Sequence, residues 1–203
     1  MILFEDLLKA HDFSQAINTF AGKFISDLNL PNVYQLGLVV PDVEKAAKKL
    51  EDQGIGPFFI ATGSPVFWNE RGEHRKISGK MGLAYYNGVE LELLEPVIGS
   101  DFYTRSLDPD KRIVLQHVGF LVKDVDAWAD KAANAGMPVY IRGQLKAWPS
   151  TTDFAYLEPL KENGLVMEFI NWRMFGLNIS PPPRLLKTVG RLEKWSGKRS
   201  IAL

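Results

Sequence analysis

The sequence predicts an α+β protein built from two tandem βαβββ modules, with additional helices at the N- and C-terminal ends. Three observations support this fold class. A segment recurs 82 residues later, both copies show one strand, one helix and further strands in the same order, and helical patterns lie outside the copies. The chain has 203 residues, of which 46% are hydrophobic, so a buried core is expected and extensive disorder is excluded.

The duplication is clearest at the start of each copy. Gln35-Leu-Gly-Leu-Val-Val stands over His117-Val-Gly-Phe-Leu-Val, and Asp42 stands over Asp124 at the same offset of 82. Such a constant offset over a strand and the start of a helix indicates that the two segments have equivalent places in the fold.

Two further matches lie later in each copy. Leu83-Ala-Tyr stands over Phe154-Ala-Tyr with an offset of 71, and Glu92-Leu-Leu stands over Glu168-Phe-Ile with an offset of 76. The change of offset fits five extra residues in the second copy, around 159–164. Matches in one consistent order are hard to obtain by chance, so we interpret the chain as an internal repeat.

A helix is expected before the first module. Asp12-Phe-Ser-Gln has a capping-box pattern. The apolar residues that follow at helical spacing are Phe13, Ile17, Phe20, Phe24 and Leu28.

The first module begins with a strand at 34–40, which is rich in Val and Leu. Asp42 then caps a helix, and Gly54 ends it. The buried stripe of this helix consists of Val43, Ala46, Ala47 and Leu50. Extended segments follow at 57–62, 81–86 and 89–94, with Asn87-Gly88 as a hairpin turn.

The second module repeats this order. Asp124 caps its helix and Gly136 ends it. The corresponding stripe consists of Val125, Trp128, Ala129 and Ala132. Extended segments follow at 139–142, 153–157 and 165–171.

The C-terminal part is locally basic. Pro181-Pro-Pro interrupts the chain, and helical spacing follows at Leu185, Val189 and Leu192, with Trp195 one turn on. The six basic residues from Arg184 onward are Arg184, Lys187, Arg191, Lys194, Lys198 and Arg199. We expect a solvated helix that docks on the body, with contact to a phosphate-bearing ligand or a partner chain as the alternative.

These patterns divide the chain into five parts. They are an N-terminal helical extension at 1–32, the first module at 33–96, a linker at 97–115, the second module at 116–172, and a basic C-terminal extension at 173–203.

The composition excludes several functions. The 24 Lys and Arg residues balance 24 Asp and Glu residues, so no attraction to nucleic acid or to acidic membranes is expected. The absence of cysteine excludes disulfides, cysteine zinc sites and a cysteine nucleophile, and it suits a cytoplasmic location. No membrane span or secretory signal is expected. Three histidines leave little room for metal sites with several imidazole ligands.

The duplication also predicts where a functional site lies. If the copies pair symmetrically, equivalent residues lie near a twofold axis, so Gln35, Glu92, His117 and Glu168 converge on one point. Glu168 lies among apolar neighbours, and a buried carboxylate is costly unless it is paired or binds a metal. One amide oxygen, one imidazole and two carboxylates suit a divalent ion such as zinc, nickel, manganese or iron. Glu90, in contrast, is expected on a solvent face.

The chain resembles the vicinal oxygen chelate superfamily, which includes glyoxalase I, methylmalonyl-CoA epimerase, bleomycin-resistance proteins and extradiol dioxygenases. The resemblance covers about 33–172 and rests on Gln35-Leu-Gly-Leu-Val-Val-Pro-Asp-Val, Glu92-Leu-Leu-Glu-Pro, His117-Val-Gly-Phe-Leu-Val-Lys-Asp-Val and Glu168-Phe-Ile. It implies an open, cupped sheet around a metal ion, in a homodimer. The resemblance implies that the metal ligands are the first residues of these four segments, Gln35, Glu92, His117 and Glu168. It further implies that the ion is zinc, nickel, manganese, cobalt or iron.

Within the superfamily the resemblance points in two directions. The ligand set is similar to that of glyoxalase I, but Val39 and Pro96 stand where that enzyme has the Arg and Asn that bind glutathione. The segment at Glu92 looks more like methylmalonyl-CoA epimerase, which usually has His in place of Gln35. A dioxygenase needs two His ligands and one carboxylate, and only His117 is in place.

The resemblance implies an enzyme that acts on a small carbonyl compound, with acyl-CoA thioesters among the candidates, through a metal-stabilised enolate. The reaction is that of an epimerase or isomerase, or of a glyoxalase-like lyase. Glu168 and Glu92 are the candidate catalytic residues, and Glu168 is the preferred base because its neighbours are the most apolar. Glu73 and His74 are weaker candidates, in a loop that is otherwise expected to be exposed.

The alternative is a non-catalytic small-molecule-binding protein of the bleomycin-resistance type. The aromatic candidates for its stacking pocket are Phe58, Phe59, Phe67, Trp68 and Trp148. Core or loop packing is the simpler interpretation of most of them. A protein that only sequesters a ligand has no reason to keep all four polar positions, so metal content distinguishes the two functions.

Overall fold

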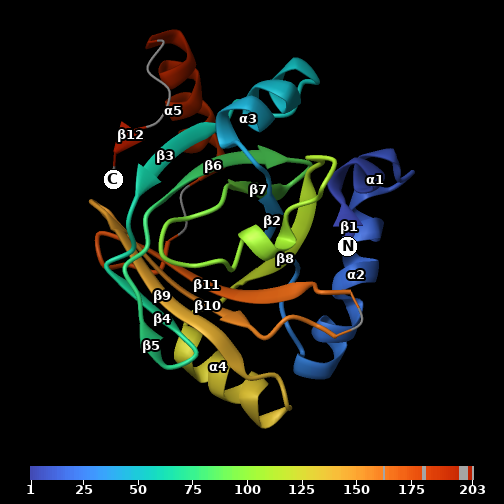
Figure 1. The fold of residues 1–203 in the computed structure, drawn as a ribbon, viewed down its shortest axis with the longest axis vertical. Coiled ribbons are helices and arrows are strands. Elements are labelled where there is room, and N and C mark those ends of the chain that lie inside the picture. Colours follow the sequence, from blue (N-terminus) through green and yellow to red (C-terminus); the bar gives the residue numbers. More distant parts are fainter. Residues whose placement is uncertain (162, 180–181, 197–200, 203) are drawn as a thin grey trace.

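The computed structural model describes residues 1–161, 163–179, 182–196 and 201–202 (Figure 1). The elements in chain order are β1 (Ile2–Leu3), α1 (Phe4–Lys9), α2 (Phe13–Leu28), β2 (Gln35–Val39), α3 (Val43–Asp52), β3 (Phe59–Gly63), β4 (Phe67–Glu70), β5 (Glu73–His74), β6 (Gly79–Tyr86), β7 (Val89–Leu94), η1 (Thr104–Ser106), β8 (Val114–Leu121), α4 (Val125–Asn134), β9 (Val139–Ala147), β10 (Ser150–Leu157), β11 (Val166–Met174), α5 (Pro183–Ser196) and β12 (Ile201–Ala202).

The strands of both modules form one curled sheet, which confirms the predicted fold class (Figure 1). The strand order is β12-β3-β6-β7-β2-β8-β11-β10-β9-β4-β5, and β1 pairs with β8. The first module consists of β2, α3, β3, β6 and β7, and the second of β8, α4, β9, β10 and β11. Outward from the central pair β2–β8, the strands follow the order β7, β6, β3 in the first module and β11, β10, β9 in the second. A pseudo-twofold axis therefore relates the two modules.

The register of the central pair carries this symmetry to individual residues. Strands β2 and β8 are antiparallel, with Gln35 opposite Gly119 and Gly37 opposite His117. Exchange of the two modules, at the offset of 82, converts one of these pairs into the other. Gln35 and His117 therefore occupy equivalent positions on either side of the axis.

The helices α1 to α4 cover the convex face of the sheet (Figure 1). Leu36 and Leu38 of β2 and Leu91 and Leu93 of β7 are buried in the core beneath them. Because successive residues of a strand point to opposite faces, the residues between them point to the concave face. There Leu94 belongs to a separate apolar cluster inside the cup.

The predicted N-terminal helix is α2, which Asp12 caps by accepting a hydrogen bond from the backbone N–H of Gln15 at 2.9 Å. Its buried residues are Phe13, Ile17, Ala21, Phe24 and Leu28. Phe20, which the helical pattern placed on the same face, is instead partly exposed. At 3.6 residues per turn, Phe20 and Ala21 lie on opposite flanks of the buried stripe, and the structure buries the flank of Ala21.

The segment around Glu73 is a hairpin instead of the expected loop. Strands β4 and β5 pair with each other, and β4 also pairs with β9 of the second module, with Phe67 opposite Gln144. Glu70 is buried and accepts a hydrogen bond from Trp68 Nε1 at 3.4 Å. The first module thus contributes strands to the far edge of the second, a pairing that no local pattern indicates.

The C-terminal helix α5 packs on β3 and β6, as a docked helix does. Its close contact is Gly190, where an added Cβ would lie 3.1 Å from the backbone of Phe58. Most of the predicted apolar stripe does not dock, since Leu185, Leu192 and Trp195 are exposed. The basic residues Lys198 and Arg199 lie outside the described residues.

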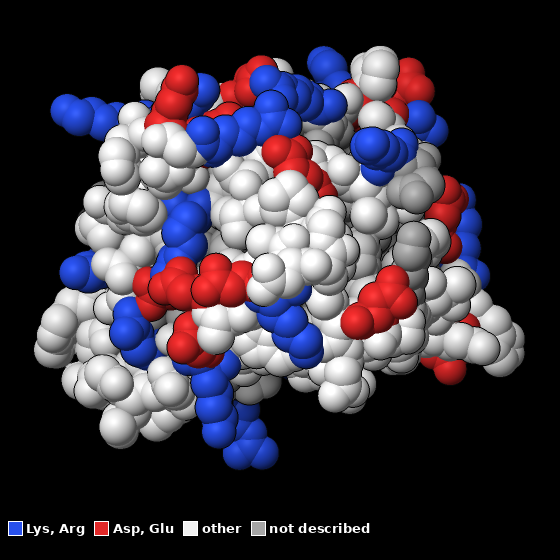
Figure 2. Space-filling model, turned by 90° about the horizontal axis from the view of Figure 1, so that it is seen from below, with Lys and Arg blue, Asp and Glu red and all other residues white. Residues whose placement is uncertain are grey.

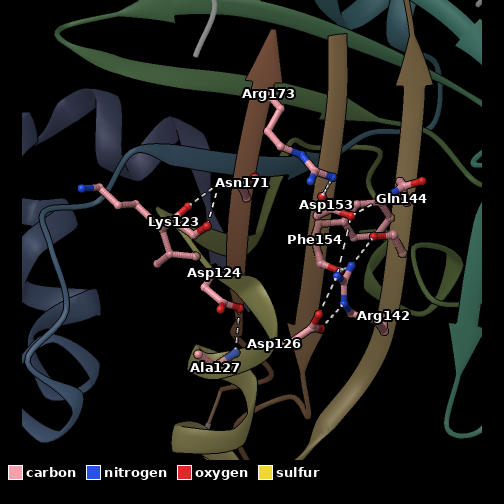
Figure 3. A network of polar contacts seen from close by, with 12 residues as sticks. Lys123, Asp124, Asp126, Ala127, Arg142, Gln144, Asp153, Phe154, Asn171 and Arg173 are labelled. Carbon is pink, nitrogen blue, oxygen red and sulfur yellow. Dashed lines mark hydrogen bonds and ion pairs between the residues drawn. The ribbon is translucent and has the colours of Figure 1, made fainter. Parts of the chain in front are cut away.

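Within the second module, a polar network joins α4 to β9 and continues across β10 and β11 (Figure 3). Arg142 of β9 contacts Asp126 of α4, with 2.7 Å between Nε and Oδ1. Asp153 of β10 accepts hydrogen bonds from Gln144 and Arg173. Because both arginines face carboxylates, their charges are compensated, and we interpret the network as structural.

Asp124 caps α4 within this region, since its Oδ1 accepts a hydrogen bond from the N–H of Ala127 at 3.0 Å (Figure 3). An Asp124→Ala variant is therefore expected to lose about 1 kcal/mol of folding stability. Chemical denaturation measures this change. Asp130→Ala, on the exposed side of the same helix, is the control and should change stability by less than about 0.5 kcal/mol. Equal effects of both substitutions would contradict a capping role.

No helix in the described part of the chain is long and apolar enough to cross a membrane. On the face shown in Figure 2, acidic and basic side chains are interspersed around uncharged surface. This pattern agrees with the net charge of zero.

Candidate metal centre

Three predicted site residues meet inside the cup. Glu92 of β7 and Glu168 of β11 flank His117 of β8, with 3.4 Å and 3.2 Å from His117 Nε2 to Oε2 of the respective carboxylates. One potential ligand atom from each residue lies within 4.8 Å of the others. All three side chains are buried, so this is an enclosed cluster of two carboxylates and one imidazole.

Gln35, the fourth predicted residue, lies in the wall of the same cavity as Glu92 and Glu168. Its Nε2 donates a hydrogen bond to Glu90 Oε1 at 2.8 Å. A carboxylate accepts hydrogen bonds but does not donate them when ionised, so this contact fixes the orientation of the amide. The Oε1 atom of Gln35 is the end that remains available as a ligand.

Buried atoms without partners test whether a cation fits here. Four buried side-chain atoms of the described residues make no aligned hydrogen bond: Gln35 Oε1, His117 Nε2 and Glu168 Oε2 at the cluster, and Trp172 Nε1 further along the cavity wall. Such atoms are rare in folded proteins because their desolvation is not compensated. Two oxygens and one imidazole nitrogen are donors that divalent zinc, nickel, manganese, cobalt or iron accept. The residues present therefore fit a divalent cation.

The electrostatics of the cluster point the same way. Burial acts to lower the pKa of His117, but the carboxylates of Glu168 and Glu92 outweigh it and raise this pKa to about 9. Burial raises the pKa of Glu168, which the charge of His117 opposes. Positive charge is thus favoured between the two carboxylates.

Two glycines at equivalent positions make room for the ligands. A Cβ on Gly37 would lie 1.7 Å from His117 Cε1, and a Cβ on Gly119 would lie 3.1 Å from Gln35 Oε1. Each glycine thus leaves space for the predicted ligand that faces it across the β2–β8 pair. The repeated Gly in Gln35-Leu-Gly and His117-Val-Gly was the sequence signal for this requirement.

Gln116 is a site residue that the sequence analysis missed. The β2–β8 register shifts between Gly37 and Leu38, which leaves Gln116 as an extra residue in a β-bulge. Its Oε1 lies 2.7 Å from His117 Nδ1. If Nδ1 donates its proton to this oxygen, the lone pair needed for a metal resides on Nε2.

A Gln116→Met variant is expected to weaken metal binding by about 10- to 100-fold, because the imidazole loses the partner that fixes its tautomer and orientation. Competition with a chromophoric chelator measures the affinity. Gln53→Met, at the exposed end of α3, is the matched control and should bind metal as the parent protein does. Unchanged affinity in a folded Gln116→Met protein would show that the contact is not needed.

Glu90 is buried, and its predicted solvent exposure was wrong. Because Glu90 and Glu92 are two residues apart on β7, their side chains share the concave face. Besides the bond from Gln35, Glu90 accepts one from the Tyr34 hydroxyl at 3.3 Å, and that hydroxyl also contacts Tyr85 at 2.7 Å. Burial raises the pKa of Glu90 to about 7. The sequence did not indicate that Glu90 is a buried hydrogen-bond acceptor, because an acidic residue in a strand is usually exposed.

A cavity of about 100 Å³ opens beside Glu92 and Glu168. Two tyrosines close its inner end: Tyr103 comes from the segment between β7 and β8, which runs inside the curl of the sheet (Figure 1), and its hydroxyl lies 3.2 Å from that of Tyr156. The Tyr156 ring lies 5.0 Å from the His117 ring. The segment predicted as a linker therefore contributes a wall of the site.

The other candidates lie elsewhere. Of the proposed stacking aromatics, Trp68 lines this cavity, whereas Phe58 is buried in the core and Trp148 is 90% exposed. Glu73 and His74 are exposed on β5, at the edge of the sheet, and do not line the cavity.

Together, the fold and the cluster define a protein of paired βαβββ modules with a buried cluster of Glu92, His117 and Glu168 at their shared axis. The family model of the Glyoxalase/Bleomycin resistance protein/Dioxygenase superfamily matches residues 34–156. This match spans more than half of the chain. The chain therefore belongs to that superfamily, which confirms the resemblance found in its sequence.

Solved structures with similarity to this chain include three from bacteria. Methylmalonyl-CoA epimerase from Mycobacterium tuberculosis is 15% identical with a TM-score of 0.44, over 75% of this chain and 89% of that chain. A mutant of 4-hydroxymandelate synthase from Streptomyces coelicolor is 11% identical with a TM-score of 0.48, over 81% of this chain and 54% of that chain. A glyoxalase family protein from Bacillus cereus is 14% identical with a TM-score of 0.23, over 68% of this chain and 91% of that chain. No curated protein matches this sequence.

Proposed function

We propose that this protein is a metal-dependent enzyme that removes a proton next to the carbonyl group of a small carbonyl compound. The reaction class is that of an epimerase or isomerase, or of a glyoxalase-like lyase, and acyl-CoA thioesters are among the candidate substrates. The observation that carries the proposal is the buried cluster of Glu92, His117 and Glu168, with Gln35 Oε1 beside it.

In this proposal Gln35, Glu92, His117 and Glu168 hold the cation. The donor atoms are Gln35 Oε1, His117 Nε2 and one oxygen of each carboxylate. A bound divalent ion would supply Lewis acidity that stabilises the negative charge of an enolate oxygen. Three of these residues come from the central strands β2 and β8 or their neighbour β11, which are paired along their length and hold the donors in place.

Glu168 is the proposed base. Its Oε2 makes no aligned hydrogen bond among the described residues, although it lies 3.2 Å from His117 Nε2, and in the proposal this oxygen accepts the proton. Burial raises the pKa of its carboxyl group, which makes the carboxylate a stronger base than an exposed one. Glu168 also lines the cavity, where a substrate has access to it.

Glu92 is the proposed second catalytic residue. The pseudo-twofold axis makes it equivalent to Glu168, and the two carboxylates lie on either side of His117 Nε2. In the proposal the substrate's α-carbon lies in the cavity that both carboxylates line, and it presents one face to each of them. Removal of a proton by one and return by the other would invert that carbon, which is the geometry that an epimerase needs.

The test is exchange of the substrate's α-hydrogen with deuterated water, measured on metal-loaded protein with 2-substituted acyl-CoA thioesters and hemithioacetals. Exchange is expected with the parent protein and with Glu73→Gln, whose carboxylate is exposed on β5. Glu168→Gln should abolish exchange while its circular dichroism stays unchanged. No exchange with any substrate in the panel would favour the alternative function, a small-molecule-binding protein of the bleomycin-resistance type.

The expected homodimer and the cytoplasmic location belong to the proposal as well. Size-exclusion chromatography with light scattering tests the first, with a mass of about twice 22.8 kDa expected. Fractionation of the source cells tests the second.

A further inference from the structure

The cavity beside the cluster has an ordered lining. Strands β10 and β11 supply one wall as three facing pairs: Tyr156 with Glu168, Phe154 with Ile170, and Thr152 with Trp172. Successive pairs are two residues apart, or about 7 Å along the strands. The wall therefore passes from the carboxylate end to an apolar middle.

The first module repeats this arrangement on its own side. Leu94 follows Glu92 on β7 as Ile170 follows Glu168 on β11, and both leucine and isoleucine line the cavity. The remaining apolar side chains of the lining include Trp68, Ile77, Met81, Val97 and Leu145. The space next to the two carboxylates is therefore apolar on both sides of the pseudo-twofold axis.

Charged groups do not face this middle part. Apart from Glu92 and Glu168, the charged residues of the lining are Lys80 and Lys146. Lys80 forms an ion pair with Glu44, at 2.7 Å between Nζ and Oε1, and Lys146 is exposed. A charged group in the middle would lose its hydration without finding an opposite charge, which is unfavourable, and the polar groups nearby are neutral: Thr152 and the indole N–H of Trp172.

We infer that the substrate carries a short apolar group next to the carbonyl oxygens that bind at the cluster. This inference rests on the proposed function and applies to free acids and thioesters alike. The cavity of about 100 Å³ is smaller than the apolar cavity of about 150 Å³ that holds benzene. A short linear or branched alkyl group fits within it, and a longer group reaches the opening.

The experiment uses alkyl hydroxamates, which chelate metal ions through two neighbouring oxygens, and measures their binding to metal-loaded protein by calorimetry. Each buried CH₂ group is expected to tighten binding about fourfold. Pentanohydroxamate should therefore bind about 50-fold more tightly than acetohydroxamate. The monohydroxamate of succinic acid, of similar length but with a carboxylate, should bind no more tightly than acetohydroxamate.

Variants locate the effect. Leu145→Gln makes one wall polar. It should weaken the binding of pentanohydroxamate at least fivefold while leaving the affinity for acetohydroxamate unchanged. Met81→Gln serves as a second variant of the wall. Leu177→Gln, at a site that is 62% exposed and outside the lining, is the matched control and should change neither affinity.

The failures are distinguishable. Tight metal binding with equal affinities for all three hydroxamates would overturn the inference and leave the proposed function standing. Absence of metal binding would overturn both.

Discussion

A Gly37→Ala variant is expected to lose about 3 kcal/mol of folding stability and most of its metal affinity. The added Cβ would lie 1.7 Å from Cε1 and 2.0 Å from Nε2 of His117, far inside contact distance. The ring is fully buried and held by Gln116, so it has no free space to move into. Overpacking of this kind typically costs about 1–3 kcal/mol, and this contact is at the severe end. Denaturant titration and chelator competition measure the two effects.

A glycine-to-alanine substitution at an open position should instead increase folding stability. Gly22 lies within α2, and a Cβ there would meet nothing within 4 Å. Gly22→Ala is therefore expected to stabilise the protein by about 0.5–1 kcal/mol, because alanine has the higher helix propensity. If both variants were stabilised, the close contact between β2 and His117 would be wrong.

Glu168→Gln is expected to lower metal affinity by more than about 100-fold, because an anionic oxygen ligand becomes a neutral amide of the same shape. This loss should exceed that of an outer contact such as Gln116, for which about 10- to 100-fold is typical. Chelator competition gives the affinity, and thermal unfolding of the metal-free protein shows whether the variant is folded.

Glu73→Gln makes the same chemical change on β5, where the carboxylate is exposed. It should leave metal affinity within about twofold of the parent value. If Glu168→Gln and Glu73→Gln bound metal equally well, the cluster would not be the metal site. His117→Ala offers a second test, since it removes the only imidazole of the cluster.

The sequence was sufficient for the main architecture. Periodic apolar residues and caps such as Asp42 and Asp124 act within a few residues, so the helices could be located from local patterns. The constant offset between the copies then placed Gln35 and His117 at equivalent positions, which the register of β2 and β8 confirms. The predicted convergence of Glu92, His117 and Glu168 followed from symmetry and not from any motif alone.

Other features depend on partners that lie far away in the sequence. Glu90 has the pattern of an exposed strand residue, and only the curl of the sheet buries it against Gln35 and Tyr34. The pairing of β4 with β9 joins segments about 75 residues apart, for which neither segment carries a local signal.

By itself, then, the sequence determined the repeat, the order of strands and helices within each βαβββ copy, and the candidate ligands, because these follow from short-range periodicity and from the equivalence of the two copies. Only the tertiary structure decided which atoms face the site. The bulge at Gln116 aims His117 Nε2 inward, Glu90 turns the Gln35 oxygen toward it, and Tyr103 closes the cavity from a segment without recognisable pattern. Side-chain orientation depends on long-range packing and hydrogen bonding, which exist only once the strands are paired.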